Sequence, residues 1–181
     1  MLEMKMSWFI KRLFEKMAVL FRYCKVWLIY RPKGFVSVLG NAYLNNPNIE
    51  FGRNVVLYPN VHIFGSGKVI LGDNVCLGDG TVICSASEIV IGVDTMVAAQ
   101  CYITDCNHGI NVLGGVMRKQ KLSIHSCRIG ENAWLGCGCK VLAGAEILNG
   151  AVIGAGTVVT GIVDENTIYV QERHCRQKLR R

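Results

Sequence analysis

The chain has 181 residues, of which 51% are hydrophobic and only 18% are charged, so a disordered polar chain is excluded and a large buried core is expected. Glycine is plentiful (20) and proline scarce (3), and the glycines show no Gly-X-Y period, which excludes collagen. The net charge of +7 is concentrated at the two ends of the chain. Residues 1–33 carry eight Lys/Arg and two acids, and residues 171–181 carry five Lys/Arg and one acid. Residues 34–170 carry seven Lys/Arg and ten acids. Because nucleic-acid-binding domains usually carry positive charge on the folded body, no nucleic-acid partner is expected.

The nine cysteines do not indicate a disulfide scaffold, because their number is odd and no C-x-x-C pair occurs. The first residues, which include Glu3 and Lys5, also lack the clean apolar segment and the cleavage site of a signal peptide. Both features predict a reducing, cytoplasmic environment.

Residues 1–33 are expected to form an amphipathic helix with a short linker. Apolar residues recur at helical spacing between residues 7 and 30, Ser7 is a suitable N-cap, and Arg31-Pro32-Lys33-Gly34 ends the pattern. Basic residues interrupt every apolar run, so the helix is not expected to cross a membrane. Two interpretations stay open: the helix packs on its own domain or a neighbouring subunit, or it lies on an anionic membrane. The second would bring the protein to the inner face of the membrane.

A six-residue repeat organises residues 34–170. From residue 51 a large apolar residue returns every six positions, with two steps of eight residues that each add two residues at the same corner. The series is Phe51, Leu57, Ile63, Leu71, Leu77, Ile83, Ile91, Val97, Ile103, Ile129, Leu135, Val141, Ile147, Ile153 and Val159. A smaller residue follows four positions after each large one, and glycine often follows directly. This pattern predicts an all-β triangular prism of about five coils, with both residue types pointing inward and glycines at corners that need a positive φ. A β-sandwich would not show this period.

The repeat is interrupted once, over residues 104–126. The step from Ile103 to Ile129 is 26 residues, whereas a hexamer with its usual corner would take eight. A long loop that leaves a rigid repeat is a candidate functional element. It contains His108, His125, Arg118, Lys119 and Lys121.

The repeat, the loop segment Asn107-His108-Gly109 and the block NAWLGCGCKVLAGAEILNGAVIGAGTVVT (residues 132–160) together resemble the hexapeptide-repeat O-acetyltransferases. The similarity is to the galactoside and maltose acetyltransferases and to the bacterial capsule and O-antigen acetyltransferases, over about residues 49–170. The resemblance implies a left-handed parallel β-helix, a homotrimer with active sites between subunits, and acetyl-CoA as the acyl donor, with no metal. The implied acceptor is a sugar hydroxyl of a cell-surface polysaccharide or its precursor.

The resemblance also implies roles for the loop residues. His108 matches the general base that takes the proton from the acceptor hydroxyl, a task that suits imidazole because its pKa is close to neutrality. Asp105 would hold the imidazole in the correct tautomer, or it is a turn-capping residue. Asn107 is a further candidate for binding the carbohydrate. By their charge, Arg118, Lys119 and Lys121 would attract an acidic glycan or would simply keep the loop soluble.

For the donor, the resemblance assigns Trp134, Cys137, Ala155 and Thr160 to the pantetheine channel. Cys137 is expected to be a small, inert residue rather than a nucleophile. The basic tail, residues 171–181, departs from the family, and Lys178 is a candidate for the phosphates of coenzyme A. Residues Ser85-Ala86 also depart from it, because the sugar acetyltransferases carry an acid near this position, which indicates a different acceptor sugar.

Three alternatives remain open. The first is an N-acetyltransferase of an amino sugar nucleotide, which the sequence does not separate strongly from an O-acetyltransferase. The second is a β-helix carbonic anhydrase, although the four histidines contain no H-x-x-x-x-H pair for zinc. The third is a non-catalytic trimer.

Overall fold

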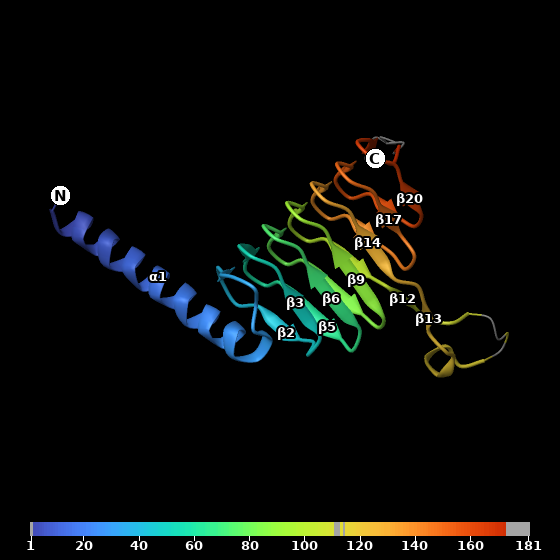
Figure 1. Cartoon of the computed structure of the whole chain (residues 1–181), viewed down its shortest axis with the longest axis horizontal. Helices are drawn as coiled ribbons and strands as arrows, with labels where there is room; N and C mark the ends of the chain where they lie inside the picture. The colour runs from blue at the N-terminus through green and yellow to red at the C-terminus, as the bar shows by residue number, and fades with distance from the viewer. Residues whose placement is uncertain (1, 111–112, 114, 173–181) are drawn as a thin grey trace, which may run out of the picture.

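The computed structural model describes residues 2–110, 113 and 115–172, with side chains from residue 12 onward. A long helix, α1 (Leu2–Tyr30), is followed by a parallel β-helix whose short strands wind around a triangular core (Figure 1). The strands form three sheets, which we name faces A, B and C, and each coil adds one strand to each face in that order. This architecture confirms the predicted all-β prism with an N-terminal helix and a protruding loop.

Face A contains β1 (Val36–Val38), β4 (Val55–Leu57), β7 (Cys76–Leu77), β10 (Met96–Val97), β15 (Trp134–Leu135), β18 (Val152–Ile153) and β21 (Ile168–Tyr169). Face B contains β2 (Tyr43–Asn45), β5 (His62–Gly65), β8 (Val82–Ser85), β11 (Tyr102–Thr104), β16 (Lys140–Val141) and β19 (Val158–Val159). Face C contains β3 (Ile49–Phe51), β6 (Lys68–Leu71), β9 (Glu88–Ile91), β14 (Cys127–Ile129), β17 (Glu146–Ile147) and β20 (Ile162–Val163).

The prism has six complete coils and begins a seventh with β21, whereas the sequence predicts about five. The additional strands lie at both ends of the predicted series: β1 and β2 precede Phe51, and β20 and β21 follow Val159. The large inward residues of the first coil are Val38, Leu44 and Phe51. The step from Leu44 to Phe51 is seven residues, which occurs nowhere else in the series, so the six-residue period does not extend to this coil.

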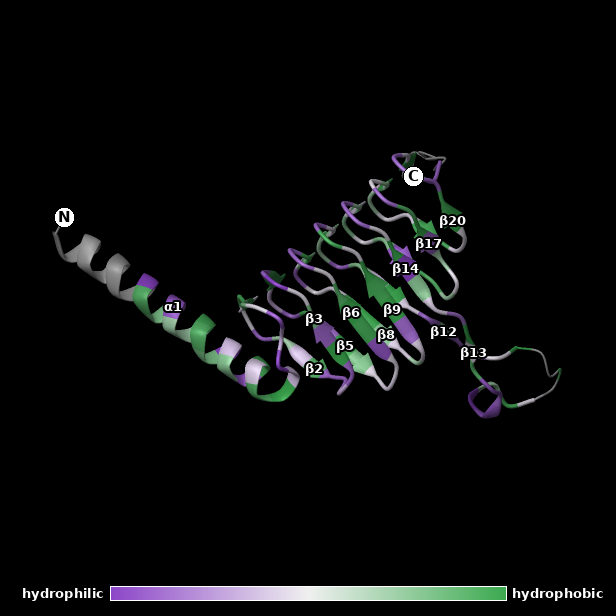
Figure 2. Cartoon of the chain, in the orientation of Figure 1, coloured by the Kyte–Doolittle hydropathy of each residue, from purple (hydrophilic) through white to green (hydrophobic). Residues whose placement is uncertain are grey.

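The core consists of stacked inward side chains, as the repeat predicts. Ile63, Ile83 and Ile103 lie in register on successive strands of face B, and none of them is exposed. The smaller inward positions are buried as well, including Thr81 and Cys101. Buried positions alternate with half-buried, outward ones along β8, and Figure 2 shows that much of the strand surface is apolar whereas polar residues are frequent at the corners. Each coil therefore buries its apolar residues against its two neighbours.

Some corner glycines, such as Gly80 and Gly138, have positive φ (66° and 71°) as the sequence predicts. The glycines that directly follow the large inward residues have a different role. Gly78 and Gly92, which directly follow large inward residues, do not have positive φ. Instead, a Cβ on Gly78 would lie 2.5 Å from the Ala99 amide nitrogen of the next coil, so close stacking requires glycine there. Several of the left-handed positions are asparagines, such as Asn54 and Asn74 (φ of 57° and 60°), because asparagine tolerates this conformation better than most residues.

Helix α1 covers the open end of the first coil with one side only. Val26 is buried, the Tyr30 hydroxyl donates to the Leu44 carbonyl oxygen at 3.0 Å, and the ring of Tyr23 lies 4.5 Å from that of Phe35. The interpretation of a helix packed on its own domain is thus confirmed for this side. The opposite side is exposed. Within residues 2–110, 113 and 115–172, no helix is long and apolar enough to span a bilayer.

Candidate functional site

The loop leaves the prism at the corner between faces B and C, in the fourth coil (Figure 1). Its stem is a two-stranded antiparallel ribbon of β12 (Cys106–Asn107) and β13 (Ser123–Ile124). Farther out lies a short 3-10 helix, η1 (Met117–Lys119). The prism continues through the insertion, because β11 pairs with both β8 and β16, and β14 pairs with both β9 and β17. The loop is therefore presented by a rigid support.

Asp105 fastens the stem of the loop to the preceding coil. Its buried carboxylate accepts hydrogen bonds from the Ser85 hydroxyl at 2.8 Å, the Ala86 amide at 2.7 Å and the Ser87 amide at 2.8 Å. The Asp105 carbonyl oxygen accepts from the His125 amide at 2.9 Å. Both oxygens of the carboxylate are thus occupied by the coil below, in place of the contact with His108 that the sequence suggests. Within the described residues, no hydrogen bond joins Asp105 to His108.

His108 lies directly after β12 and is exposed, as is Asn107 beside it. Gly109, which the sequence analysis names beside His108 without giving it a role, is buried next to the returning chain, and a Cβ there would overlap the Lys121 carbonyl oxygen. This close approach positions the backbone that follows His108. A glycine after the candidate base was the only sequence signal for it. His125 contacts Ser123, with 3.2 Å between Nε2 and Oγ.

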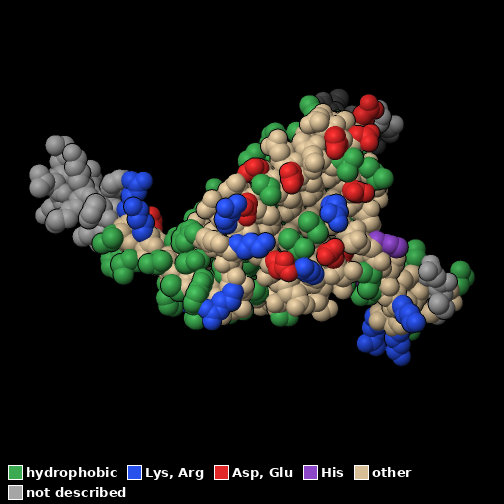
Figure 3. Space-filling view, in the orientation of Figure 1, with side chains coloured by type: hydrophobic (Ala, Val, Ile, Leu, Met, Phe, Trp, Pro, Cys, Tyr) green, Lys and Arg blue, Asp and Glu red, His purple; other side chains and the backbone are tan. Residues whose placement is uncertain are grey.

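The far part of the loop is cationic. Arg118 and Lys119 lie in η1, Lys121 follows it, and all three are exposed. Figure 3 shows these basic side chains gathered on the projecting loop. The sequence from Cys106 to Ser126 contains no acid, so the loop attracts anionic groups.

The predicted donor-binding residues lie on two different edges of the prism. Cys137 and Ala155 are exposed on successive coils at the corner between faces A and B, where the Gly156 amide donates to the Cys137 carbonyl oxygen at 2.7 Å. Thr160 lies at the corner between faces B and C, the corner that carries the loop. Trp134 points outward from face A and is 49% exposed. Lys178 lies outside the described residues.

The corner of Cys137 and Ala155 has small side chains on successive coils. Within the described chain, the amides of these two residues donate no backbone hydrogen bond. The Ala155 amide nitrogen faces Gly136 of the neighbouring coil, where a Cβ would lie 2.7 Å from it, so the close stacking of these coils depends on glycine.

The buried thiols are not nucleophiles. Burial raises the pKa of the Cys101 thiol to about 11. Burial and then the neighbouring Cys106 thiol raise the pKa of Cys84, which lies beside Thr104 on the adjacent strand. The raised pKa values keep both thiols protonated at neutral pH; Cys101 is a small core residue, whereas Cys84 is half-buried on the outward side of β8. In the part of the chain that the structure describes, no three His, Cys, Asp or Glu side chains are placed to hold a metal.

Comparison with known proteins agrees with this arrangement. The family model described as bacterial transferase hexapeptide (six repeats) matches residues 126–161. The chain is 35% identical over 133 residues to the putative lipopolysaccharide biosynthesis O-acetyl transferase WbbJ of Escherichia coli (strain K12), a match that covers 68% of each chain. It is 28% identical over 143 residues to the putative colanic acid biosynthesis acetyltransferase WcaF of the same organism, covering 78% of this chain and 71% of that protein.

Among solved structures, the fold is similar to that of AntD, an N-acyltransferase from Bacillus cereus in complex with dTDP and 3-hydroxybutyryl-CoA. The TM-score is 0.67 at 16% identity, and the match covers 80% of each chain. At this identity the likeness concerns the fold alone.

Proposed function

The chain belongs to the bacterial hexapeptide-repeat acetyltransferases, and from this premise we propose that it transfers the acetyl group of acetyl-CoA to a sugar hydroxyl. The observation that carries the proposal is the exposed His108 on a ribbon that projects from an unbroken prism. The relatives named for lipopolysaccharide and colanic acid biosynthesis favour a cell-surface polysaccharide or its precursor as acceptor.

In the proposed reaction His108 takes the proton of the acceptor hydroxyl as the oxygen attacks the thioester carbonyl carbon. The new C–O bond forms, the C–S bond breaks, and the thiolate of coenzyme A receives the proton from the imidazolium. The products are the sugar ester and coenzyme A. General-base assistance of this kind contributes about 10²–10⁴-fold to a rate. Asp105 supports the step indirectly, because it holds the stem that carries His108.

The proposal includes a homotrimer, and the position of the donor-binding residues supports it. Face B separates the edge of Cys137 and Ala155 from the edge of Thr160 and the loop. A donor molecule that contacts Cys137 and Ala155 as well as Thr160 must therefore lie between one edge of one copy and the other edge of an adjacent copy. Face A also presents a column of outward apolar side chains, with Met96, Trp134 and Ile168 between 49% and 76% exposed. Contact between prisms would cover this column.

The cationic loop is proposed to bind the acceptor through Asn107, Arg118 and Lys119. Three exposed cations without a neighbouring acid suit a glycan that carries carboxylates or a phosphate-linked precursor. We place the enzyme in the cytoplasm next to the inner face of the membrane, where lipid-linked precursors are available, and the positive charge of the N-terminal segment supports this location.

The test is release of coenzyme A thiol by the purified protein with acetyl-CoA and a panel of oligosaccharides, with amino sugar nucleotides included as acceptors. His108→Ala should lower turnover by about 10²–10⁴-fold and leave acetyl-CoA binding, measured by calorimetry, unchanged. His125→Ala, in the same loop, is the control and should retain most of the turnover. Unchanged turnover in His108→Ala would remove the base assignment. Turnover only with amino sugars would assign N-acetylation instead.

A further inference from the structure

The side of α1 that faces away from the prism is a continuous apolar strip. We name it the outer strip. It consists of Leu13, Phe14, Met17, Leu20, Phe21, Trp27 and Leu28, which are between 44% and 66% exposed. Met17 and the buried Val26 are nine residues apart, which is about 180° around a helix at 3.6 residues per turn. The outer strip is therefore directed away from the core that the other side of α1 covers.

The helix crosses the end of the prism transversely to the direction in which the coils stack, and its N-terminal part extends past the prism (Figure 1). Contacts with the prism come from the C-terminal half, where Arg22 donates to the Val38 carbonyl oxygen at 3.4 Å and Tyr30 donates to the Asn46 carbonyl oxygen at 3.0 Å. Figure 3 shows a group of apolar side chains on the described part of this end of the molecule, with basic side chains beside them. This leaves a long apolar surface directed along the prism axis, away from the coils.

Positive charge borders the outer strip. Lys25 lies with its Nζ 4.8 Å from the Phe21 ring centroid, Arg31 lies 4.1 Å from that of Trp27, and Lys16 is exposed. Residues 12–33 contain six Lys/Arg and a single acid, Glu15. Glu15 precedes Met17 by two residues, about 160° around the helix at 3.6 residues per turn, so it does not interrupt the strip.

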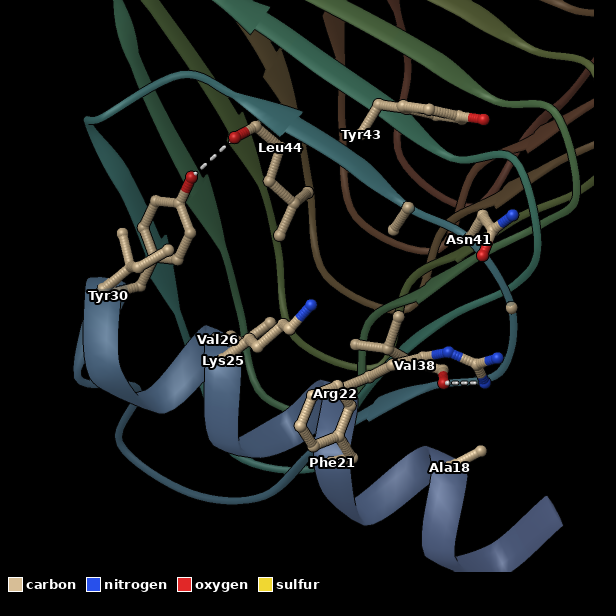
Figure 4. A pocket seen from close by; sticks show the side chains of 13 residues that line it. Ala18, Phe21, Arg22, Lys25, Val26, Tyr30, Val38, Asn41, Tyr43 and Leu44 are labelled. Atoms are coloured by element: carbon tan, nitrogen blue, oxygen red, sulfur yellow. Dashed lines mark hydrogen bonds between the residues drawn. The ribbon is translucent and has the colours of Figure 1, made fainter. Parts of the chain in front are cut away.

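Space for a polar headgroup is present beside the strip. A cavity of about 620 Å³ lies between α1 and the first coil, and both Lys25 and Arg22 line it together with Asn41 and Tyr43 (Figure 4). Phe21, a member of the outer strip, forms part of its wall. A single lipid molecule could therefore place its acyl chain against the outer strip and its phosphate near Lys25.

The geometry points to an anionic lipid bilayer as the occupant of the outer strip, with α1 lying in the interface. Helices that bind this way have apolar and aromatic residues on one side and Lys/Arg at the borders, whose stems reach back toward the headgroups. A soluble protein partner with an apolar groove would not need the bordering cations, whereas anionic headgroups attract each of them. In the homotrimer on which the proposed function relies, rotation about an axis parallel to the prisms would place three such helices in one plane.

The test measures binding of the full chain to sedimented vesicles of phosphatidylcholine alone and of phosphatidylcholine with phosphatidylglycerol. Wild type should bind the anionic vesicles, and salt should weaken binding. Lys16→Gln/Lys25→Gln should bind about thirtyfold more weakly, since each basic residue near the surface contributes about 1 kcal/mol. Arg128→Gln/Lys140→Gln, which removes two exposed cations of the prism, is the matched control and should bind within about twofold of wild type.

The apolar contribution is tested by Leu28→Glu, which should weaken binding at least about tenfold. Ile162→Glu, at the far end of the prism, is the control because the two side chains are similarly exposed (63% and 69%). Light scattering reports the number of chains per particle for every variant. Absence of vesicle binding by wild type, or equal losses in the controls, would overturn the inference. A further result would also overturn it: Leu28→Glu could change the number of chains per particle and leave vesicle binding unchanged. That result would mean that a second copy of the chain, and not a bilayer, covers the outer strip. Transfer to a water-soluble acceptor needs no vesicles, so failure here is separable from failure of the proposed chemistry.

Discussion

Replacing Asp105 by alanine is expected to release the loop stem from the third coil. The carboxylate accepts three hydrogen bonds of 2.7 to 2.8 Å and is completely buried. Hydrogen bonds to a charged group are worth about 1.5–3 kcal/mol each, and the vacated space lets water reach some of the freed donors. A loss of about 3–5 kcal/mol in the free energy of unfolding follows. In a chain of this size such a loss lowers Tm by roughly 6–20 °C.

Thermal unfolding followed by circular dichroism measures this effect, and Asp79→Ala is the matched control. Asp79 is exposed and accepts one hydrogen bond, from Asn60 Nδ2 at 3.0 Å, so its replacement should change stability by at most about 0.5 kcal/mol. Equal Tm values for the two variants would refute the anchoring role. Asp105→Asn gives a second test, because it keeps an acceptor for the Ala86 amide and should lose less stability. A shift in the pH profile of its turnover, at unchanged Tm, would instead indicate direct action on His108.

Two further predictions concern the loop and the thiols. Gly109→Ala should lower turnover at least about tenfold with little change in Tm, because its Cβ displaces the chain beside His108; Gly161→Ala, where nothing lies within 4 Å, should behave as wild type in the same assays. In labelling with iodoacetamide at pH 8, followed by peptide mass spectrometry, the exposed Cys137 should react well before Cys101, whose pKa of about 11 leaves roughly one thiol in a thousand ionised. Labelling of Cys101 at the rate of Cys137 would show that the prism opens.

The sequence was sufficient to predict the prism because its period is a local property. Each large residue, such as Leu77 or Ile83, has the same spacing and the same inward direction as the previous one. The stacking of coils then places equivalent residues on top of one another. The first two strands were missed because the step from Leu44 to Phe51 is seven residues, and β20 was missed because Val163 follows Val159 by only four. Close stacking of Gly78 on Ala99 could not be read from the chain either, since it depends on the distance between coils.

The site was less accessible to sequence reasoning. Asp105 stands three residues before His108, and this spacing favours a catalytic pair, but its actual partners begin at Ser85, twenty residues earlier. One coil takes about twenty residues here, so the structure brings these positions together where the linear sequence separates them. The proposed donor site, with Cys137 and Thr160 on different edges, also depends on which corner each residue occupies.

The continuous pairing across the insertion has a consequence for how this protein can diverge. Ile103 stacks on Ile83 below and Val141 above, and Ile129 stacks on Ile91 and Ile147, so the coils do not depend on the segment between them. The excursion between Cys106 and Ser126 can therefore change in length and composition while the scaffold keeps its register. Under the proposed function, exchange of this segment between relatives would transfer acceptor preference as a unit and leave the corners proposed for the donor in place.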